Sequence, residues 1–382
     1  MQEINLVPKI IFGDHALDYL KEMVNERIVI ITDHFISSLP NFAEIKETLA
    51  INNTVTVFQD VVPDPPIENI IAGIKTFEET VPTVIIAIGG GSAIDAAKGI
   101  VYFACKVNTQ IDRSSIYFVV IPTTSGTGSE VTDFAVITDK DKGLKYPLVE
   151  DDLLPDAALL ETDLVMELPP AVTADTGIDV LTHAIEAYVS TNASPFSDAL
   201  AEKAIRLVFE NLPKAYAAGK KDRAAREKMH QASTIAGLAF TMASLGINHS
   251  LAHAIGGTFH LVHGRINGVL LKNVILYNAG LIDSQRCPET DRALKRYSEI
   301  AQMIGVTVKN PQFAVQQLTQ NIQRLLKQLE MPQTFSEFGI DASQYAEATA
   351  AIAQAALKDR CTPTNPRKPN ISDLEMLLKR TY

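Results

Sequence analysis

The chain has 382 residues, of which 46% are hydrophobic and 21% charged, a composition typical of a globular protein with two domains. Its net charge of −11 argues against an extended basic surface for nucleic acid or for an anionic membrane. Three widely spaced cysteines, Cys105, Cys287 and Cys361, exclude a disulfide framework and favour a reducing compartment. Because the N-terminal segment lacks a signal-peptide pattern and no apolar run reaches about 18 residues, we expect a cytoplasmic protein without a membrane span.

In chain order, the N-terminal part alternates short apolar runs with helical patterns. Strands are predicted at residues 9–12, 28–32, 54–58, 83–88 and 116–121. Helical patterns lie near residues 15–25 and 67–79, and again in AIDAAKGIVYFAC after Ser92. This alternation indicates βαβ units, and the apolar strands indicate a parallel sheet that is covered on both faces.

The pattern changes after residue 133. FAVITD, GLKYPLV and DAALLE are predicted as short extended pieces, and Pro169 and Pro170 then suit the start of a helix. Helical periodicity continues from Ala171 to the C-terminus, with breaks expected at Gly246, Gly264, Pro288 and Pro311. We therefore predict an α/β dinucleotide-binding domain with a mostly parallel sheet at residues 1–163, and an all-helical metal-binding and catalytic domain at residues 164–382.

Two loops of small residues follow predicted strands. The first, Gly89-Gly90-Gly91-Ser92, lies where a strand meets a helix, so its backbone could approach a phosphate at the helix N-terminus. A tight strand–helix turn is the alternative, and the G-x-G-x-x-G fingerprint is absent. The second loop, TTSGTGS at residues 123–129, offers hydroxyl and amide groups after the next strand. Two such loops at the carboxyl ends of strands predict a nucleotide site.

Two charged residues extend this prediction. Asp33 ends the strand at residues 28–32, where a carboxylate can accept hydrogen bonds from the adenosine ribose and repel a 2′-phosphate. That role favours NAD over NADP, and the alternative is a helix N-cap. Lys145 lies in an otherwise apolar extended piece, either in contact with nucleotide or as an ordinary surface lysine.

Histidines are concentrated in GINHSLAHAIGGTFHLVHG, at residues 246–264. This stretch holds four of the eight histidines of the chain: His249, His253, His260 and His263. Such a cluster is a compositional signal for metal binding. Four imidazoles are more than one catalytic ion needs, since an open position must remain for substrate. At least one of these histidines is therefore expected to be a proton relay or to contact a metal ligand without binding the ion itself. The spacing does not say which histidine this is.

Asp179 and His183 supply further donors. They stand four residues apart, so a helix places them on one face, either as metal ligands or as a simple hydrogen-bonded pair. Asp175 lies one turn earlier and ranks below Asp179, because an acid there also suits the first turn of a helix. An oxygen and nitrogen donor set of this kind suits Zn²⁺, Fe²⁺ or a similar divalent ion.

Together these motifs resemble those of the iron-dependent (group III) alcohol dehydrogenases. GGGSAIDAAKGI, IPTTSGTGSEVT, TGIDVLTHAIEAYVS, NHSLAHAIGG and the His-Gly pair before Arg265 are similar to the family's motifs in order and spacing. The resemblance covers nearly the whole chain, including CTPTNPRKPNISDLE near its end. Within the family, the chain is most similar to the propanol and ethanol dehydrogenases associated with catabolic microcompartments.

The resemblance assigns roles residue by residue. It implies a divalent ion, Fe²⁺ in preference to Zn²⁺, held by Asp179, His183, His249 and His263, with Val262-His263-Gly264 in place of the usual Pro-His-Gly. It places His253 close to the nicotinamide as a proton relay and leaves His260 without a role. The implied NAD contacts are Asp33, Asp64 (where asparagine is common), Gly90, Gly91, Ser92, Thr123, Thr124, Thr127 and Lys145. The implied substrate pocket contains Phe134, Phe240 and Cys361, and two phenylalanines favour a short apolar alcohol.

The resulting hypothesis is reversible NAD-dependent oxidation of short primary alcohols such as propanol and ethanol to their aldehydes. Two enzymatic alternatives remain: a polyol dehydrogenase of the glycerol type, and a lyase resembling dehydroquinate synthase that uses NAD internally. A non-enzymatic scaffold is a third. The partners expected are the small-molecule substrate and further copies of the chain, as a dimer or larger homo-oligomer. The expected location is the cytoplasm, with packaging in a bacterial microcompartment as a further option.

Overall fold

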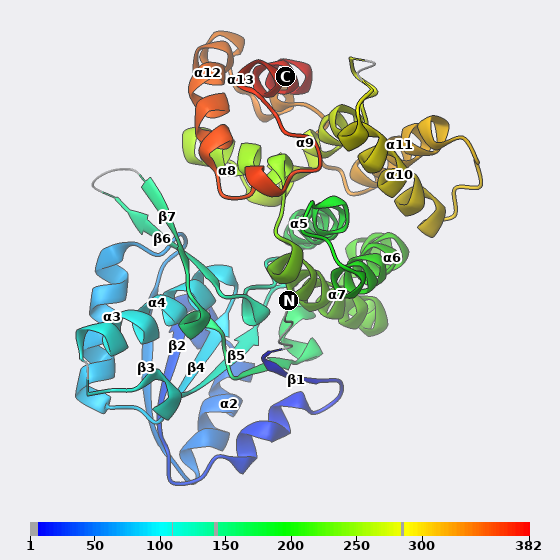
Figure 1. Cartoon of the computed structure of the whole chain (residues 1–382). Coiled ribbons are helices and arrows are strands. Elements are labelled where there is room, and N and C mark those ends of the chain that lie inside the picture. Colours follow the sequence, from blue (N-terminus) through cyan, green and yellow to red (C-terminus); the bar gives the residue numbers. More distant parts are fainter. Residues whose placement is uncertain (1–6, 109, 141–143, 284–285) are drawn as a thin grey trace. The chain divides into compact units, whose positions relative to one another are not determined.

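A computed structural model describes residues 7–108, 110–140, 144–283 and 286–382, with the side chains of Leu144 and Lys145 outside the description. The chain forms two compact units, Met1–Glu167 and Leu168–Tyr382, each shown in Figure 1. The division into domains at residue 163 stays a prediction, since compactness does not show that each part folds alone. In the described part no single helix is long and apolar enough to cross a membrane. One bent pair, Arg223–Ala243 with Ile247–Phe259, passes that test only when taken together.

The first unit is built on a six-stranded sheet in which every neighbouring pair is parallel. Its strand order is β1-β8-β5-β4-β2-β3. The strands are β1 Lys9–Phe12, β2 Arg27–Asp33, β3 Thr54–Val61, β4 Val84–Gly89, β5 Tyr117–Pro122 and β8 Ala157–Leu160. Two further strands, β6 Phe134–Asp139 and β7 Leu144–Val149, form a separate antiparallel pair. The predicted α/β fold with a mostly parallel sheet is confirmed.

Helices cover both faces of this sheet because successive residues of each strand point to opposite sides. Val29 and Ile31 of β2 pack with helices α3 (Ile67–Thr80) and α4 (Gly91–Val107). Ile28 and Ile30 pack on the other face with α2 (Pro40–Ala50) and the 3₁₀ helix η1 (Ala16–Glu22). The short α1 (His34–Ser37) follows β2 directly, and neither α1 nor α2 was among the predicted helices.

The second unit is helical. Its helices are α5 Pro170–Val189, α6 Pro195–Ala218, α7 Arg223–Ala243, α8 Ile247–Phe259, α9 His263–Asn278, α10 Pro288–Met303, α11 Pro311–Gln328, α12 Ala342–Lys358 and α13 Ile371–Thr381. Pro288 and Pro311 begin helices and Gly246 caps α8, as predicted. The break expected at Gly264 is wrong: Gly264 is the second residue of α9, and the chain leaves the helix at residues 260–262 instead.

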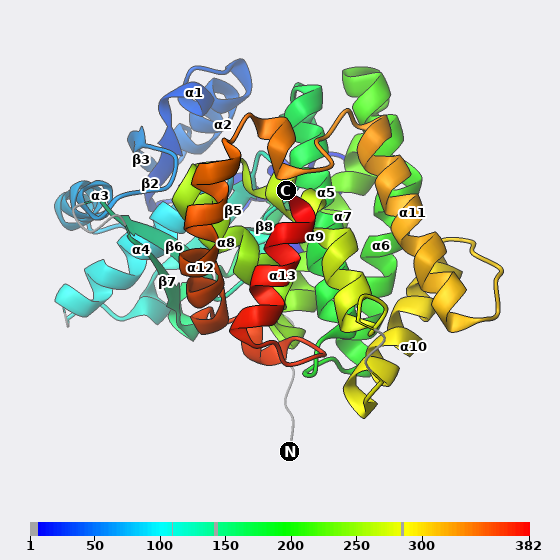
Figure 2. The ribbon, with the colours of Figure 1, turned by 90° about the horizontal axis from the view of Figure 1, so that it is seen from above.

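Two apolar clusters organise this unit. The larger one surrounds α5, which is buried from Thr173 to Val189 apart from Thr176 and packs against α6, α7 and α9. The smaller one joins α8, α9, α12 and α13, with α12 lying against α8 and α13 against α9 (Figure 2). Helices α5, α8 and α9 are therefore fixed relative to one another, and they carry the predicted metal ligands.

Candidate functional site

The two small-residue loops of the first unit meet at the carboxyl edge of the sheet. Strand β4 lies between β2 and β5, so the loops that follow β4 and β5 are neighbours. A Cβ added to Gly91 would stand 2.8 Å from Cγ2 of Thr127, and one added to Gly90 would stand 3.2 Å from Cγ2 of Thr124. A larger residue at either position would have to push the threonine side chain aside, so the glycines keep the two loops close and leave the N-terminus of α4 bare for a ligand.

Other predicted cofactor residues reach the same edge. Oδ2 of Asp33 lies 3.8 Å from the position that a Cβ on Gly89 would take, while Oδ1 of Asp33 accepts a hydrogen bond from N–H of Ile36 at 2.9 Å. Asp33 is therefore also the helix cap that was the alternative interpretation. Asp64 has a positive φ of 52°, a conformation that asparagine and aspartate tolerate best, and its N–H donates to Oγ of Ser92 at 3.3 Å.

Three further residues of the first unit were predicted to contact the cofactor or the substrate. Thr123 is buried, and its N–H donates to the carbonyl of Gly89 at 2.9 Å. Lys145 lies on β7 opposite Thr138, and the prediction for its side chain lies outside the described residues. Phe134 begins β6, where its carbonyl accepts a hydrogen bond from the buried ammonium of Lys98 at 2.8 Å. Its place in a substrate pocket stays a prediction.

The metal candidates of the second unit converge from three helices. Asp179 and His183 come from α5, His249 from α8 and His263 from α9. Oδ1 of Asp179 lies 3.5 Å from Nε2 of His249, 3.7 Å from Nε2 of His263 and 4.0 Å from Nε2 of His183. We call these four residues the Asp179 cluster. One carboxylate oxygen thus faces three imidazole nitrogens, although the first and last of these residues, Asp179 and His263, are 84 positions apart in the sequence.

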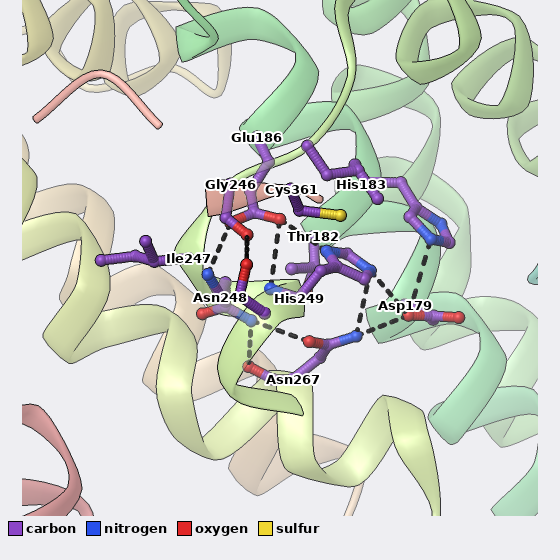
Figure 3. Close-up of polar contacts among 12 residues, drawn as sticks. Asp179, Thr182, His183, Glu186, Gly246, Ile247, Asn248, His249, Asn267 and Cys361 are labelled. Carbon is purple, nitrogen blue, oxygen red and sulfur yellow. Dashed lines mark hydrogen bonds and ion pairs between the residues drawn. The ribbon is translucent and has the colours of Figure 1, made fainter. Parts of the chain in front are cut away.

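A layer of polar groups holds these donors in place (Figure 3). Nδ1 of His249 lies 2.5 Å from Oε2 of Glu186, and Oε1 of Glu186 accepts from N–H of Asn248 at 2.7 Å. Nδ2 of Asn267 donates to Oδ1 of Asp179 at 2.7 Å, and Nδ2 of Asn248 donates to Oδ1 of Asn267 at 2.9 Å. Such contacts fix the orientation of a ligand and direct Nε2 of His249 toward Asp179.

The electrostatics of the cluster favour a cation. Burial by itself would raise the pKa of Asp179, but the adjacent imidazoles of His183, His263 and His249 outweigh it and hold this pKa well below the usual range. Burial likewise works against a charged His249, yet its contacts with Asp179 and Glu186 raise the pKa to about 9. The two carboxylates that favour a proton on this ring also favour a metal ion at Nε2. The donor set therefore fits a divalent ion such as Fe²⁺ or Zn²⁺.

Glu186 was not predicted, although the sequence held a signal for it. It stands seven residues after Asp179 and three after His183, so all three share one face of α5. Asn267 stands four residues after His263 on α9 in the same way. The common periodicity could have identified both residues once Asp179 and His263 had been singled out.

We expect Glu186→Gln to weaken metal binding by about 10- to 100-fold while the protein remains folded, because the neutral amide stabilises His249 as a ligand less well. Metal content after dialysis against graded chelator concentrations measures the change. Glu202→Gln, on the next helix α6, is the matched control. Unchanged metal retention in Glu186→Gln would show that its contact with His249 is only structural.

His253 lies beside the Asp179 cluster. Its ring stacks on that of His263 at 5.4 Å between centroids, and its Nδ1 lies 2.9 Å from Oδ2 of Asp359. The His253 side chain is 38% exposed. Phe240 and Cys361, both predicted for the substrate pocket, also belong to this region: the Phe240 ring lies 4.6 Å from that of His183, and the thiol of Cys361 is close to His253 and Asp359.

Two of the candidate metal ligands lie apart from the Asp179 cluster. His260 is exposed and ends α8 with a positive φ of 53°, so its position is that of a helix C-cap. Oδ1 of Asp175 accepts a hydrogen bond from Nε of Arg265 at 2.8 Å, which agrees with its lower rank as a ligand.

Comparison with known proteins identifies the family. Residues 8–162 match the family described as iron-containing alcohol dehydrogenase, and residues 173–382 match the C-terminal part of the Fe-containing alcohol dehydrogenase family. The chain is 44% identical over 382 residues to the 1-propanol dehydrogenase PduQ of Citrobacter freundii, covering 99% of each chain. It is 35% identical over 397 residues to the NADPH-dependent butanol dehydrogenase of Clostridium saccharobutylicum, covering 100% of this chain and 98% of that one.

A solved structure agrees with these relatives. The iron-containing alcohol dehydrogenase of Thermococcus thioreducens superposes with a TM-score of 0.89 at 30% identity, covering 100% of this chain and 99% of that one. The helices that carry the Asp179 cluster and the sheet that carries the two loops thus belong to one fold shared along the full chain. The chain belongs to the iron-containing alcohol dehydrogenase family and is an enzyme of that type.

Proposed function

We propose that this enzyme interconverts short primary alcohols, such as propanol and ethanol, with their aldehydes, using NAD(H) and a divalent ion, Fe²⁺ in preference to Zn²⁺. The observation that carries the proposal is the convergence of three imidazole Nε2 atoms within 4.0 Å of Oδ1 of Asp179. Asp179, His183, His249 and His263 would hold the ion. When bound, it supplies a Lewis acid for the alcohol or carbonyl oxygen, and the cofactor exchanges hydride with the substrate carbon.

The residues around the donors support a small apolar substrate. Phe240 lies against His183 and Cys361 is buried, so two side chains that do not compete well for hydroxyl groups border the donors. A second or third hydroxyl of a polyol would lose its hydrogen bonds with water there, at a cost of roughly 1–3 kcal/mol each. The propanol and butanol dehydrogenases among the relatives act on alcohols of this size.

An alcohol-length series with enzyme purified without oxygen and loaded with one Fe²⁺ tests the proposal. We expect NADH to accumulate with propanol and ethanol, and kcat/KM for propanol to exceed that for glycerol by at least about tenfold. A preference for glycerol would favour the polyol dehydrogenase. Absence of net NADH would favour the lyase, and absence of both metal and NAD binding would favour a scaffold.

The choice of cofactor is predicted to depend on Asp33. We expect Asp33→Ser to raise the ratio of kcat/KM with NADP to that with NAD by at least about tenfold, because a like-charge contact with the 2′-phosphate costs several kcal/mol. Serine keeps the side-chain oxygen that caps α1, so the helix is retained. Asp60→Asn, at the neighbouring strand β3, is the control. An unchanged ratio would remove Asp33 from the cofactor site.

We propose His253 as the residue that carries the alcohol proton to solvent, since its ring stacks on that of His263, its side chain is partly exposed and its Nδ1 is held by Asp359. His253→Ala should lower kcat by about 100-fold with the catalytic metal retained, in the range of general acid–base effects. The control is His260→Asn, which keeps a residue suited to positive φ. Full turnover of His253→Ala between about pH 6 and 9 would end the relay proposal.

We also propose a homo-oligomer, a dimer or larger, located in the cytoplasm or inside a bacterial microcompartment. Sedimentation equilibrium of the purified protein tests the first part, and a monomer at micromolar concentration would contradict it. Fractionation of cells that form shells tests the second, because packaged enzyme would sediment with shell proteins.

A further inference from the structure

A second group of metal-ligating side chains lies beside the Asp179 cluster. His253, Asp359 and Cys361 each offer one ligand atom, and these atoms lie within 4.8 Å of one another. We propose that these three residues, which we call the His253 triad, form a second metal site that takes a thiophilic divalent cation such as Zn²⁺. The site is distinct from the Asp179 cluster because it contains sulfur and shares no residue with it.

The structure already fixes the positions of the three donors. Oδ1 of Asp359 accepts hydrogen bonds from N–H of Cys361 at 2.8 Å and from Oγ of Ser250 at 3.3 Å. Its second oxygen, Oδ2, is thereby directed to Nδ1 of His253, 2.9 Å away. Asp359 and Cys361 are two residues apart in the turn after α12, and His253 comes from α8, which packs against α12. A cation therefore finds its donors on elements that are already packed together.

The chemistry of the donors selects the ion. Imidazole, carboxylate and thiolate together suit Zn²⁺, and three protein ligands leave a fourth position for water. On binding at Nδ1 of His253, the cation takes the place of the proton between this atom and Oδ2 of Asp359, and the neutral ring then carries its proton on Nε2. The cation also displaces the proton of the Cys361 thiol to solvent. The carboxylate and thiolate then carry two negative charges, which balance the charge of the ion.

Because the His253 triad lies next to the Asp179 cluster, a metal ion bound to the triad should affect both metal binding and catalysis at that cluster. The His253 ring stacks on that of His263, one of the four residues of the Asp179 cluster, at an interplanar angle of 12°. Two cations on adjacent rings repel each other, so the triad should bind more weakly than the Asp179 cluster. If His253 carries the substrate proton, as the proposed function holds, then an ion bound to the triad occupies this ring, and His253 can no longer transfer the proton. Excess zinc would then inhibit the enzyme without displacing the catalytic ion.

Cobalt(II) separates the two sites by spectroscopy, independently of activity. The full-length protein, carrying one equivalent of Co²⁺, is titrated with further Co²⁺ under nitrogen. The Asp179 cluster supplies only oxygen and nitrogen, so a thiolate-to-cobalt charge-transfer band in the near ultraviolet can come only from a cysteine ligand. We expect the band to grow with the second equivalent, and Zn²⁺ to abolish it by competition.

Variants assign the band to a residue. Cys361→Ser should lose it and the second bound ion, whereas Cys105→Ser and Cys287→Ser should keep both. His253→Ala, at a partly exposed position, should weaken the second binding step by at least about tenfold. A missing band in the wild type, or one that persists in Cys361→Ser, overturns the proposal. Failure of the proposed function would appear separately, as absent alcohol oxidation in a protein that still shows the thiolate band.

Discussion

Asp179→Asn is expected to give a folded protein that retains no catalytic metal ion and whose kcat/KM is at least about 100-fold below that of the wild type. Asparagine has the size of aspartate and keeps one oxygen at the position that three imidazole nitrogens face, but it lacks the negative charge. Substitution of residues that only hydrogen-bond to metal ligands already lowers metal affinity or activity by about 10- to 100-fold, so loss of a charged ligand should lower them more. Metal analysis together with alcohol oxidation by the purified variant measures the effect.

Asp175→Asn is the matched control, because it makes the same chemical change one turn earlier on α5. Oδ1 of Asp175 accepts a hydrogen bond from Arg265, so this variant loses an ion pair and not a donor of the Asp179 cluster. We expect it to bind one metal ion per chain. Stoichiometric metal in Asp179→Asn, or its loss from both variants alike, would contradict the assignment of Asp179.

Gly264→Ala is expected to displace His263 and to destabilise the protein. A Cβ on Gly264 would stand 1.9 Å from the backbone oxygen of Asp175 and 2.6 Å from its carbonyl carbon. Backbone atoms of a buried helix cannot rotate away, so the first turn of α9 must move, and overpacking of this kind costs about 1–3 kcal/mol. Because His263 immediately precedes Gly264, we expect the metal ion to be lost as well.

Gly257→Ala provides the comparison, since nothing lies within 4 Å of a Cβ at this exposed position on α8. That substitution should be neutral or stabilising by up to about 1 kcal/mol, because alanine favours a helix over glycine. Urea unfolding followed by circular dichroism, with metal analysis of the same samples, distinguishes the two variants. Equal stability and equal metal content would show that α9 adapts without moving His263.

The local pattern predicted the strands of the first unit well. The five predicted apolar runs all became parallel strands. The central strands β2, β4 and β5 are apolar on both faces, which makes them easy to recognise, whereas the edge strands β1 and β3 are partly exposed and were recognised by their β-branched and aromatic residues. DAALLE was assigned only as an extended piece, yet β8 lies between β1 and β5 in the sheet. Strand order depends on contacts between distant segments, so local periodicity carries no information about it. Gly264 illustrates the same limit, since a glycine needed for close packing looks like a helix break.

The sequence by itself determined the donor chemistry of this protein: a run of histidines, a carboxylate one turn before His183, and two small-residue loops after strands. It also determined the family, because the five motifs occur in the family's order. Residue type and spacing left open which donors meet; the family resemblance implied a set of four, and the tertiary structure decided their actual neighbours. It brought His249 and His263 to Asp179, placed Glu186 behind His249, and paired His253 with Asp359, which lies 106 residues away in sequence. Residue type and spacing set what a side chain can bind, whereas helix packing sets its neighbours.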